Sequence, residues 1–148
     1  MRPQAWSGAY KVWGIYNKEA DVRVPHNPYG DGPERFEFKT ADFSANPYIA
    51  LSGIIASGAD GLTKNLRLPD PVQRDPAKYT QAEMKKLGIE LLPTSVSAAL
   101  RKLDKDRVLK DAFGEEYYKI YSAVKLFEER AIKKLSLQDE RKILLTWY

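Results

Sequence analysis

The sequence predicts an α+β fold, with short antiparallel strands at the N-terminus and helices throughout the C-terminal half. Two observations support this prediction: alternating or β-branched runs end at Thr40, and helical spacing with capping residues dominates from Pro47 onward. Strands followed by helices, instead of alternating with them, are typical of α+β proteins. The length of 148 residues suffices for one core, so we expect residues 1–148 to form a single domain.

Three short strands are expected before residue 41. Residues 10–16 are rich in aromatic and β-branched side chains, and residues 20–24 alternate between small or apolar and charged ones. Residues 26–34 contain two prolines and two glycines and form a loop. The turns between the strands favour antiparallel pairing. In the third strand, residues 35–40, alternation places three charged side chains on one face: Arg35, Glu37 and Lys39.

The first long helix is expected to begin at Pro47, because proline suits the first helical position and Asn46 is a good N-cap. Gly58 or Gly61 can end it. Small residues recur along this helix, which indicates close packing against another element, most simply the sheet. Residues 80–83 (Thr-Gln-Ala-Glu) form a capping box that is expected to open a short helix, which Gly88 ends. Further helices are expected at residues 96–103, 106–113, 115–134 and 136–147.

Composition excludes several classes of protein. The chain is 43% hydrophobic and 30% charged, as in globular proteins, and its net charge of +4 is too mild to predict a nucleic-acid partner. It has no cysteine, which excludes disulfides and thiolate chemistry, and its one histidine excludes a two-histidine metal site within one chain. No apolar stretch approaches the ~20 residues of a membrane span, and no signal peptide is recognisable, so we expect a cytoplasmic protein.

The charged face has two interpretations from the residues alone. Its charges can form cross-strand ion pairs on a solvated surface, which is common in antiparallel sheets. Alternatively, cations on neighbouring strands around one carboxylate suit a site for phosphate and a metal ion. The residues that would form this site are Lys18, Arg23, Arg35, Glu37 and Lys39.

Several motifs resemble those of the glutamine synthetase family. Arg35-x-Glu37-x-Lys39, followed by residues 44–48 (Ser-Ala-Asn-Pro-Tyr), is similar to the family's Arg-x-Glu-x-Arg…Ser-Ala-Asn-Pro-Tyr segment. Residues 13–25, 92–106 and 113–128 resemble further family segments in the same order. The resemblance covers nearly the whole chain and begins in the middle of the family's catalytic domain. It therefore implies the C-terminal portion of such a domain, and residues 6–10 (Trp-Ser-Gly-Ala-Tyr) resemble the nodulin-like, glutamine-synthetase-like subgroup.

The resemblance implies an ATP-dependent carboxylate–amine ligase that joins glutamate or a related acid to an amine and releases ADP and phosphate. It implies that Glu37 binds one of two Mg²⁺ or Mn²⁺ ions and that Arg35 contacts ATP. Lys39 stands where the family has the arginine that holds the substrate carboxylate. Lys18 replaces a family arginine that stabilises the transferring phosphoryl group. Arg23 matches the next arginine of the family pattern. Lysine cannot make the planar two-pronged contact of arginine, which puts both replaced roles in doubt.

Most of the family's metal-binding glutamates and its metal-binding histidine have no counterpart here, so we expect the isolated chain not to be competent. It then forms part of a ring-shaped homo-oligomer with active sites between subunits, or a partner of the missing N-terminal part. The alternative is a non-catalytic remnant that keeps the fold and acts in assembly or nucleotide binding. Neither reading involves a membrane or nucleic acid.

Trp6 is a further point of interest because it lies seven residues before Trp13. At that spacing, typical members of the family carry a flap glutamate that takes a proton from ammonium. Indole cannot accept a proton, although its face can attract a cation. Either the parent enzyme uses a larger or more apolar amine, or another acid, or Trp6 merely packs and the register is shifted by a residue.

Overall fold

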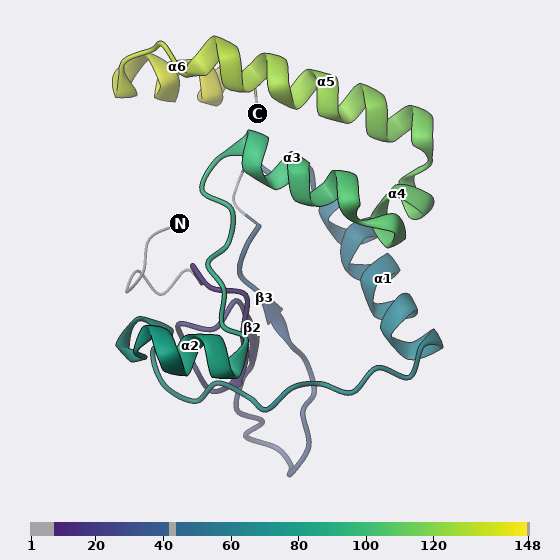
Figure 1. Cartoon of the computed structure of the whole chain (residues 1–148), viewed down its shortest axis with the longest axis vertical. Coiled ribbons are helices and arrows are strands. Elements are labelled where there is room, and N and C mark those ends of the chain that lie inside the picture. The colour runs from purple at the N-terminus through teal and green to yellow at the C-terminus, as the bar shows by residue number, and fades with distance from the viewer. Residues whose placement is uncertain (1–7, 42–43, 148) are drawn as a thin grey trace. The chain divides into compact units, whose positions relative to one another are not determined.

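The computed structural model describes residues 8–41 and 44–147, the side chain of Trp147 excepted. It contains three short strands followed by six α-helices in the described residues, so the α+β prediction is confirmed. The contacts separate the described residues into two compact units, one formed by residues 8–41 with 67–92 and one formed by residues 44–66 with 93–147 (Figure 1).

The first unit contains a three-stranded sheet in the order β1-β2-β3, formed by Trp13–Ile15, Val22–Val24 and Glu37–Phe38. Strands β2 and β3 are antiparallel, as expected, and Arg23 lies opposite Glu37. Strands β1 and β2 are parallel, so the antiparallel prediction is wrong for this pair. All three strands are shorter than expected.

The link between β1 and β2 explains the parallel pairing. Tyr16 takes a positive φ of 60°, which turns the chain away from a hairpin. The buried Asn17 then donates hydrogen bonds to the backbone carbonyls of Val72 (2.7 Å) and Arg74 (3.0 Å). Ala20 follows and is fully buried. Because the link is tied to a segment more than fifty residues away, the chain returns to the start of β1 and runs in the same direction.

The core of the first unit forms where residues 9–12, just before β1, pack against the segment of residues 67–92. This segment contains the 3-10 helix η1 (Pro76–Lys78) and α2 (Gln81–Leu87). The predicted capping box at the start of α2 is present, and Gly88 ends the helix with a φ of 66°, also as predicted. The buried cluster consists of Ala9, Tyr10, Val72 and Ile89.

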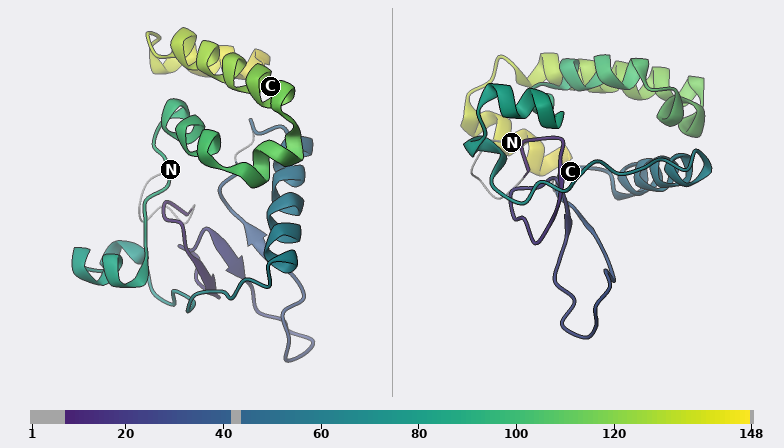
Figure 2. Two further views of the ribbon diagram at one scale, coloured as in Figure 1. Left: turned by 45° about the vertical axis from the view of Figure 1, so that its right-hand side comes forward. Right: turned by 60° about the horizontal axis from the view of Figure 1, so that its bottom comes forward.

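The second unit is helical and contains α1 (Pro47–Thr63), α3 (Val96–Lys105), α4 (Arg107–Phe113), α5 (Glu115–Ile132) and α6 (Leu137–Trp147). Helix α4 packs against α1, α3 and α5, and α3 also packs against α5. Figure 2 shows these helices from two further sides. The expected helices are therefore confirmed, with boundaries that differ by one or two residues.

Helix α1 begins as predicted and ends later than predicted. The Asn46 side chain accepts hydrogen bonds from the first backbone amides, with Pro47 at the start. The helix continues through both glycines that were expected to end it, because the terminating residue is Asn65, which adopts a left-handed φ of 49° just after the C-cap. Its small residue Gly53 faces α4. Packing of α1 on the sheet stays a prediction.

Within the described residues, none of the helices combines the length and the apolar character that crossing a membrane requires.

Gly14 in β1 gives a direct test of the packing between the strand and residues 67–92. A Cβ atom added there would lie 2.4 Å from the carbonyl oxygen of Val72, which Asn17 holds in place. We expect Gly14→Ala to lower the free energy of unfolding by about 1–3 kcal/mol, as overpacking does. Gly32→Ala is the matched control, because nothing lies near its added Cβ. Equal urea midpoints for the two variants would contradict this packing.

Candidate functional site

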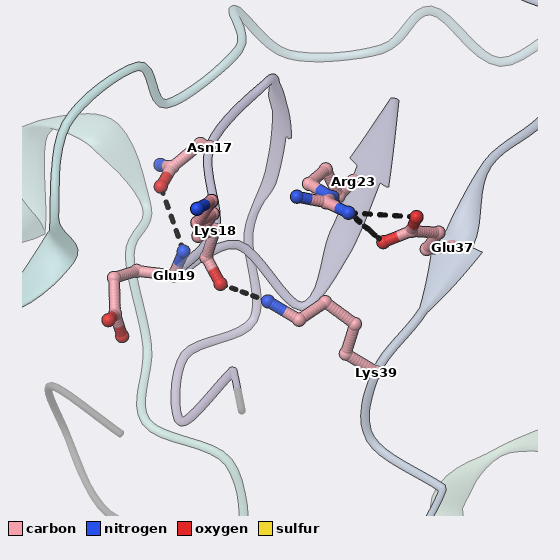
Figure 3. A network of polar contacts seen from close by, with 6 residues as sticks. All are labelled: Asn17, Lys18, Glu19, Arg23, Glu37 and Lys39. Atoms are coloured by element: carbon pink, nitrogen blue, oxygen red, sulfur yellow. Dashed lines mark hydrogen bonds and ion pairs between the residues drawn. The ribbon is translucent and has the colours of Figure 1, made fainter. Parts of the chain in front are cut away.

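The centre of the candidate site is an ion pair between neighbouring strands. Arg23 of β2 donates from Nε to Oε2 of Glu37 and from Nη2 to Oε1, both at 2.8 Å (Figure 3). Both side chains are partly buried. Two-pronged contacts of this kind are among the strongest hydrogen bonds in proteins and fix the relative orientation of both groups. The cross-strand interpretation of the charged face is therefore correct for these two residues.

This pair keeps Glu37 ionised. The hydrogen bonds from Arg23 lower the pKa of the Glu37 carboxyl below its usual value, and the charges of Arg23, Arg35 and Lys39 lower it further. In return, the hydrogen bond to Glu37 raises the pKa of the Arg23 guanidinium. Glu37 thus keeps its negative charge to a lower pH than an ordinary glutamate, and the carboxylate is the form in which an oxygen ligand binds Mg²⁺ or Mn²⁺.

Lys39 lies on the same face and reaches across to the link before β2. Its ammonium donates to the backbone carbonyl of Lys18 (Figure 3). Burial lowers the pKa of Lys39, and the positive charge of Arg23 acts in the same direction. The buried Asn17 supports this link, because its side chain also accepts a hydrogen bond from the backbone amide of Glu19 at 3.0 Å. The structure therefore brings the backbone of Lys18 to Lys39, while the Lys18 side chain is exposed.

Arg35 occupies a different setting. It is exposed and lines a hollow of about 420 Å³ whose other walls are mostly apolar. Its charge still lowers the pKa of Glu37, which places it within electrostatic reach of the ion pair. A guanidinium beside an apolar recess suits a ligand with both a charged and a flat apolar part. The other lining residues are Trp13, Val22, Val24, Pro33, Glu34, Phe36 and Leu68.

Asp21 is a site residue that the sequence analysis did not single out. It is buried and accepts a hydrogen bond from the Thr40 hydroxyl. Burial raises the pKa of Asp21 to about 6, against the opposing effect of the Lys39 charge. Asp21 could have been singled out from the sequence, because it precedes Arg23 by two residues and so lies on the same face of the strand.

No complete metal site is present in the described part of the chain. None of its histidine, cysteine, aspartate and glutamate side chains gather in groups of three or more that could hold a metal ion. Glu37 has the right oxygen donor for Mg²⁺ or Mn²⁺ and fits as one ligand, but further ligands have to come from elsewhere. Trp6 lies outside the described residues. The individual roles of Lys18, Arg23, Arg35, Glu37 and Lys39 stay predictions.

A sheet face with several cations around one ionised carboxylate is suited to bind anionic groups such as phosphate and carboxylate. Comparison with known proteins shows to which family the chain belongs. Residues 1–143 match the family described as glutamine synthetase, catalytic domain. The chain therefore belongs to the glutamine synthetase family.

Known relatives are similar along most of this chain. Type-1 glutamine synthetase 1 of Dictyostelium discoideum is 33% identical over 142 residues, which is 95% of this chain and 27% of that protein. Gamma-glutamylpolyamine synthetase of Streptomyces coelicolor is 33% identical over 137 residues, 91% of this chain and 29% of that protein. Glutamine synthetase of Methanocaldococcus jannaschii is 38% identical over 117 residues, covering 79% and 25%. The chain thus spans between a quarter and three tenths of these relatives' length.

The raised pKa of Asp21 predicts how stability changes with pH. Well below its unfolded pKa of 3.8, Asp21 is protonated in both the folded and the unfolded chain, and its contribution to the free energy of unfolding is fully present. As the pH rises toward 6 the unfolded chain loses the proton first, so the free energy of unfolding falls, by about 3 kcal/mol for a shift from 3.8 to about 6. Asp21→Asn should remove this fall.

The measurement is urea denaturation of both proteins between pH 4 and pH 7, read as the difference between them so that other carboxyl groups cancel. Asp31→Asn changes an exposed aspartate and serves as the matched control; it should follow the wild-type curve. A constant difference between wild type and Asp21→Asn over this range would show that Asp21 is not protonated preferentially in the fold.

Proposed function

We propose that the chain forms part of the active site of an ATP-dependent carboxylate–amine ligase, which joins glutamate or a related acid to an amine through an acyl phosphate. The observation that supports this most directly is the cluster of Arg23, Glu37 and Lys39 on one sheet face. Formation of an acyl phosphate requires neutralisation of the transferring phosphoryl group and a fixed substrate carboxylate. The cluster offers cations for both tasks.

In this proposal Arg23 and Glu37 exchange partners when ATP binds. In the structure, each neutralises the other through two hydrogen bonds. A divalent cation bound with ATP would reduce the negative charge on the transferring phosphoryl group. Glu37 would supply one carboxylate ligand to that cation. Arg23, repelled by the cation, would then turn its donors toward the phosphoryl oxygens, and the Lys18 side chain could join it there as a second positive charge.

Arg35 and Lys39 are assigned to the two substrates. The apolar hollow beside Arg35 suits the base of ATP, while the guanidinium suits its phosphates. Lys39 would hold the carboxylate of the acid. Its ammonium has three donors, so it can bind a carboxylate while one donor stays on the Lys18 carbonyl, but as a point charge it orients a carboxylate less strictly than arginine does.

A second function is supported by the absence of a complete metal cluster among the described residues. In that case the chain is a non-catalytic remnant that binds nucleotide or takes part in assembly. Under either function we expect a cytoplasmic protein that works as a homo-oligomer or with a polypeptide that supplies the remaining active-site residues.

The first test concerns the isolated 148-residue chain. We expect it not to release phosphate from ATP in the presence of Mg²⁺, glutamate and ammonia, because Glu37 is the one strong ligand candidate among the described residues and one carboxylate cannot hold two metal ions. Phosphate release is measured against Glu37→Gln, which keeps the shape of the side chain and removes its charge. Turnover clearly above that of Glu37→Gln would contradict the expectation and show that the chain is competent alone.

The second test concerns the amine. If Trp6 stands at the position of the flap glutamate, a full-length homologue with this segment should use ammonia poorly, because indole accepts no proton. One relative is named as a gamma-glutamylpolyamine synthetase, a name that refers to an amine larger than ammonia. We expect Trp6→Glu in such a homologue to increase ammonia turnover at least tenfold, within the range that general-base catalysis supplies. Comparable ammonia turnover with either residue would refute this assignment.

A further inference from the structure

The first unit contains a second hollow, of about 400 Å³, next to the one that Arg35 lines. Its walls come from the residues around the start of β1, from the start of β2 and from residues 67–92, all within this one unit. The volume lies within the roughly 300–1,000 Å³ that is usual for small-molecule sites. Arg23, Glu37 and Lys39 are not among the described residues that line it, so the second hollow is separate from the candidate site.

Most of the wall of the second hollow is apolar and held in place. Val72 is 7% exposed and belongs to the buried cluster. The indole of Trp13 donates from Nε1 to the backbone carbonyl of Pro69 at 2.8 Å, which fixes the orientation of the ring. Such a wall suits the apolar body of a ligand. The apolar lining residues are Val12, Trp13, Val22, Pro69, Val72 and Leu87.

Two carboxyl groups also line the second hollow. Asp21 lies just before β2 and is buried, and Asp70 lies in the segment of residues 67–92 and is exposed. Among the described residues, the Thr40 hydroxyl is the one donor to the Asp21 side chain, and it uses Oδ1. The second oxygen, Oδ2, can therefore accept a hydrogen bond from a ligand.

The positive charges near these carboxyl groups are directed elsewhere. Lys11 lines the second hollow but forms an ion pair with Glu90 at 3.3 Å. Lys39 attracts Asp21 from the neighbouring strand, while its ammonium donates to the backbone carbonyl of Lys18. Burial outweighs this attraction and raises the pKa of Asp21 to about 6. A cation bound beside Asp21 would supply the counter-charge that a buried carboxylate requires.

We propose that the second hollow binds a small primary amine with an apolar body, which places its ammonium against Asp21 and its body against Trp13 and Val72. An ammonium offers three donors, so it can bind Oδ2 of Asp21 and still be attracted by the carboxylate of Asp70. An anionic ligand would be repelled by both carboxylates. A metal ion fits less well, because no group of three or more suitable side chains exists among the described residues.

The experiment is a titration of the full 148-residue chain with 2-phenylethylamine as the probe, followed by the NMR shifts of backbone amides at about pH 7.5. Saturable shifts are expected at residues that line the second hollow, such as Val12, Val22 and Gly88. 2-Phenylethanol, which keeps the apolar body without the charge, and methylammonium, which keeps the charge without the body, should each bind at least about tenfold more weakly.

The charge of Asp21 makes the affinity depend on pH. Between about pH 7.5 and pH 5 Asp21 takes up a proton while the probe stays cationic, so the affinity of the wild type should fall about tenfold. Asp21→Asn keeps the shape of the side chain and an acceptor for Thr40. It should bind the probe about tenfold more weakly at the higher pH and lose most of this pH dependence.

Two further variants complete the test. Asp70→Asn, on the exposed rim, should weaken binding severalfold and keep the pH dependence. Asp31→Asn is the matched control, because it removes an exposed carboxylate outside the second hollow and should bind like the wild type. The amide spectrum of each variant verifies its fold. Because binding is read without turnover, the result is independent of the proposed ligase reaction. Absence of saturable shifts at these residues, equal affinity for 2-phenylethanol, or a wild-type affinity that does not change with pH would each overturn the proposal.

Discussion

The ion pair between Arg23 and Glu37 is the interaction on which the site depends. It joins β2 to β3 at opposing positions, in a register that puts Lys39 next to the link before β2. A shift of one residue in this register would turn the charged residues of β3 to the other face. The pair therefore acts as a geometric constraint, and it also sets the ionisation of Glu37.

The same interaction relates the structure to its family. A face of cations around one carboxylate suits the binding of anionic groups such as phosphate, and in the structure Arg23 and Glu37 neutralise each other. The proposed ligase and a remnant that only binds nucleotide would both make use of this face. They differ in whether other polypeptide supplies the metal ligands that the described residues lack. Under the proposed function, the competence of the chain depends on further ligands around Glu37, whereas the fold class and the family are established.

Local chemistry was predictable from the sequence, and long-range contacts were not. The caps at Asn46 and Thr80 and the stop at Gly88 depend on residues close in the chain, and all three are confirmed. The parallel pairing of β1 and β2 depends on Asn17 reaching carbonyls around residue 72, which no local pattern shows. Asp21 could have been found from its place on the face of Arg23, but its burial depends on contacts that the sequence does not reveal.

The central claim is that Arg23 holds Glu37 as a carboxylate through two hydrogen bonds. The most direct measurement is the carboxyl titration of Glu37 by carbon-13 NMR in the wild type, in Arg23→Lys and in Arg35→Lys. Because lysine cannot make the two-pronged contact, Arg23→Lys should return the Glu37 pKa toward its usual value. Arg35→Lys, which keeps a charge that acts only at a distance, should leave the Glu37 pKa low. An ordinary Glu37 pKa in all three proteins would contradict the claim.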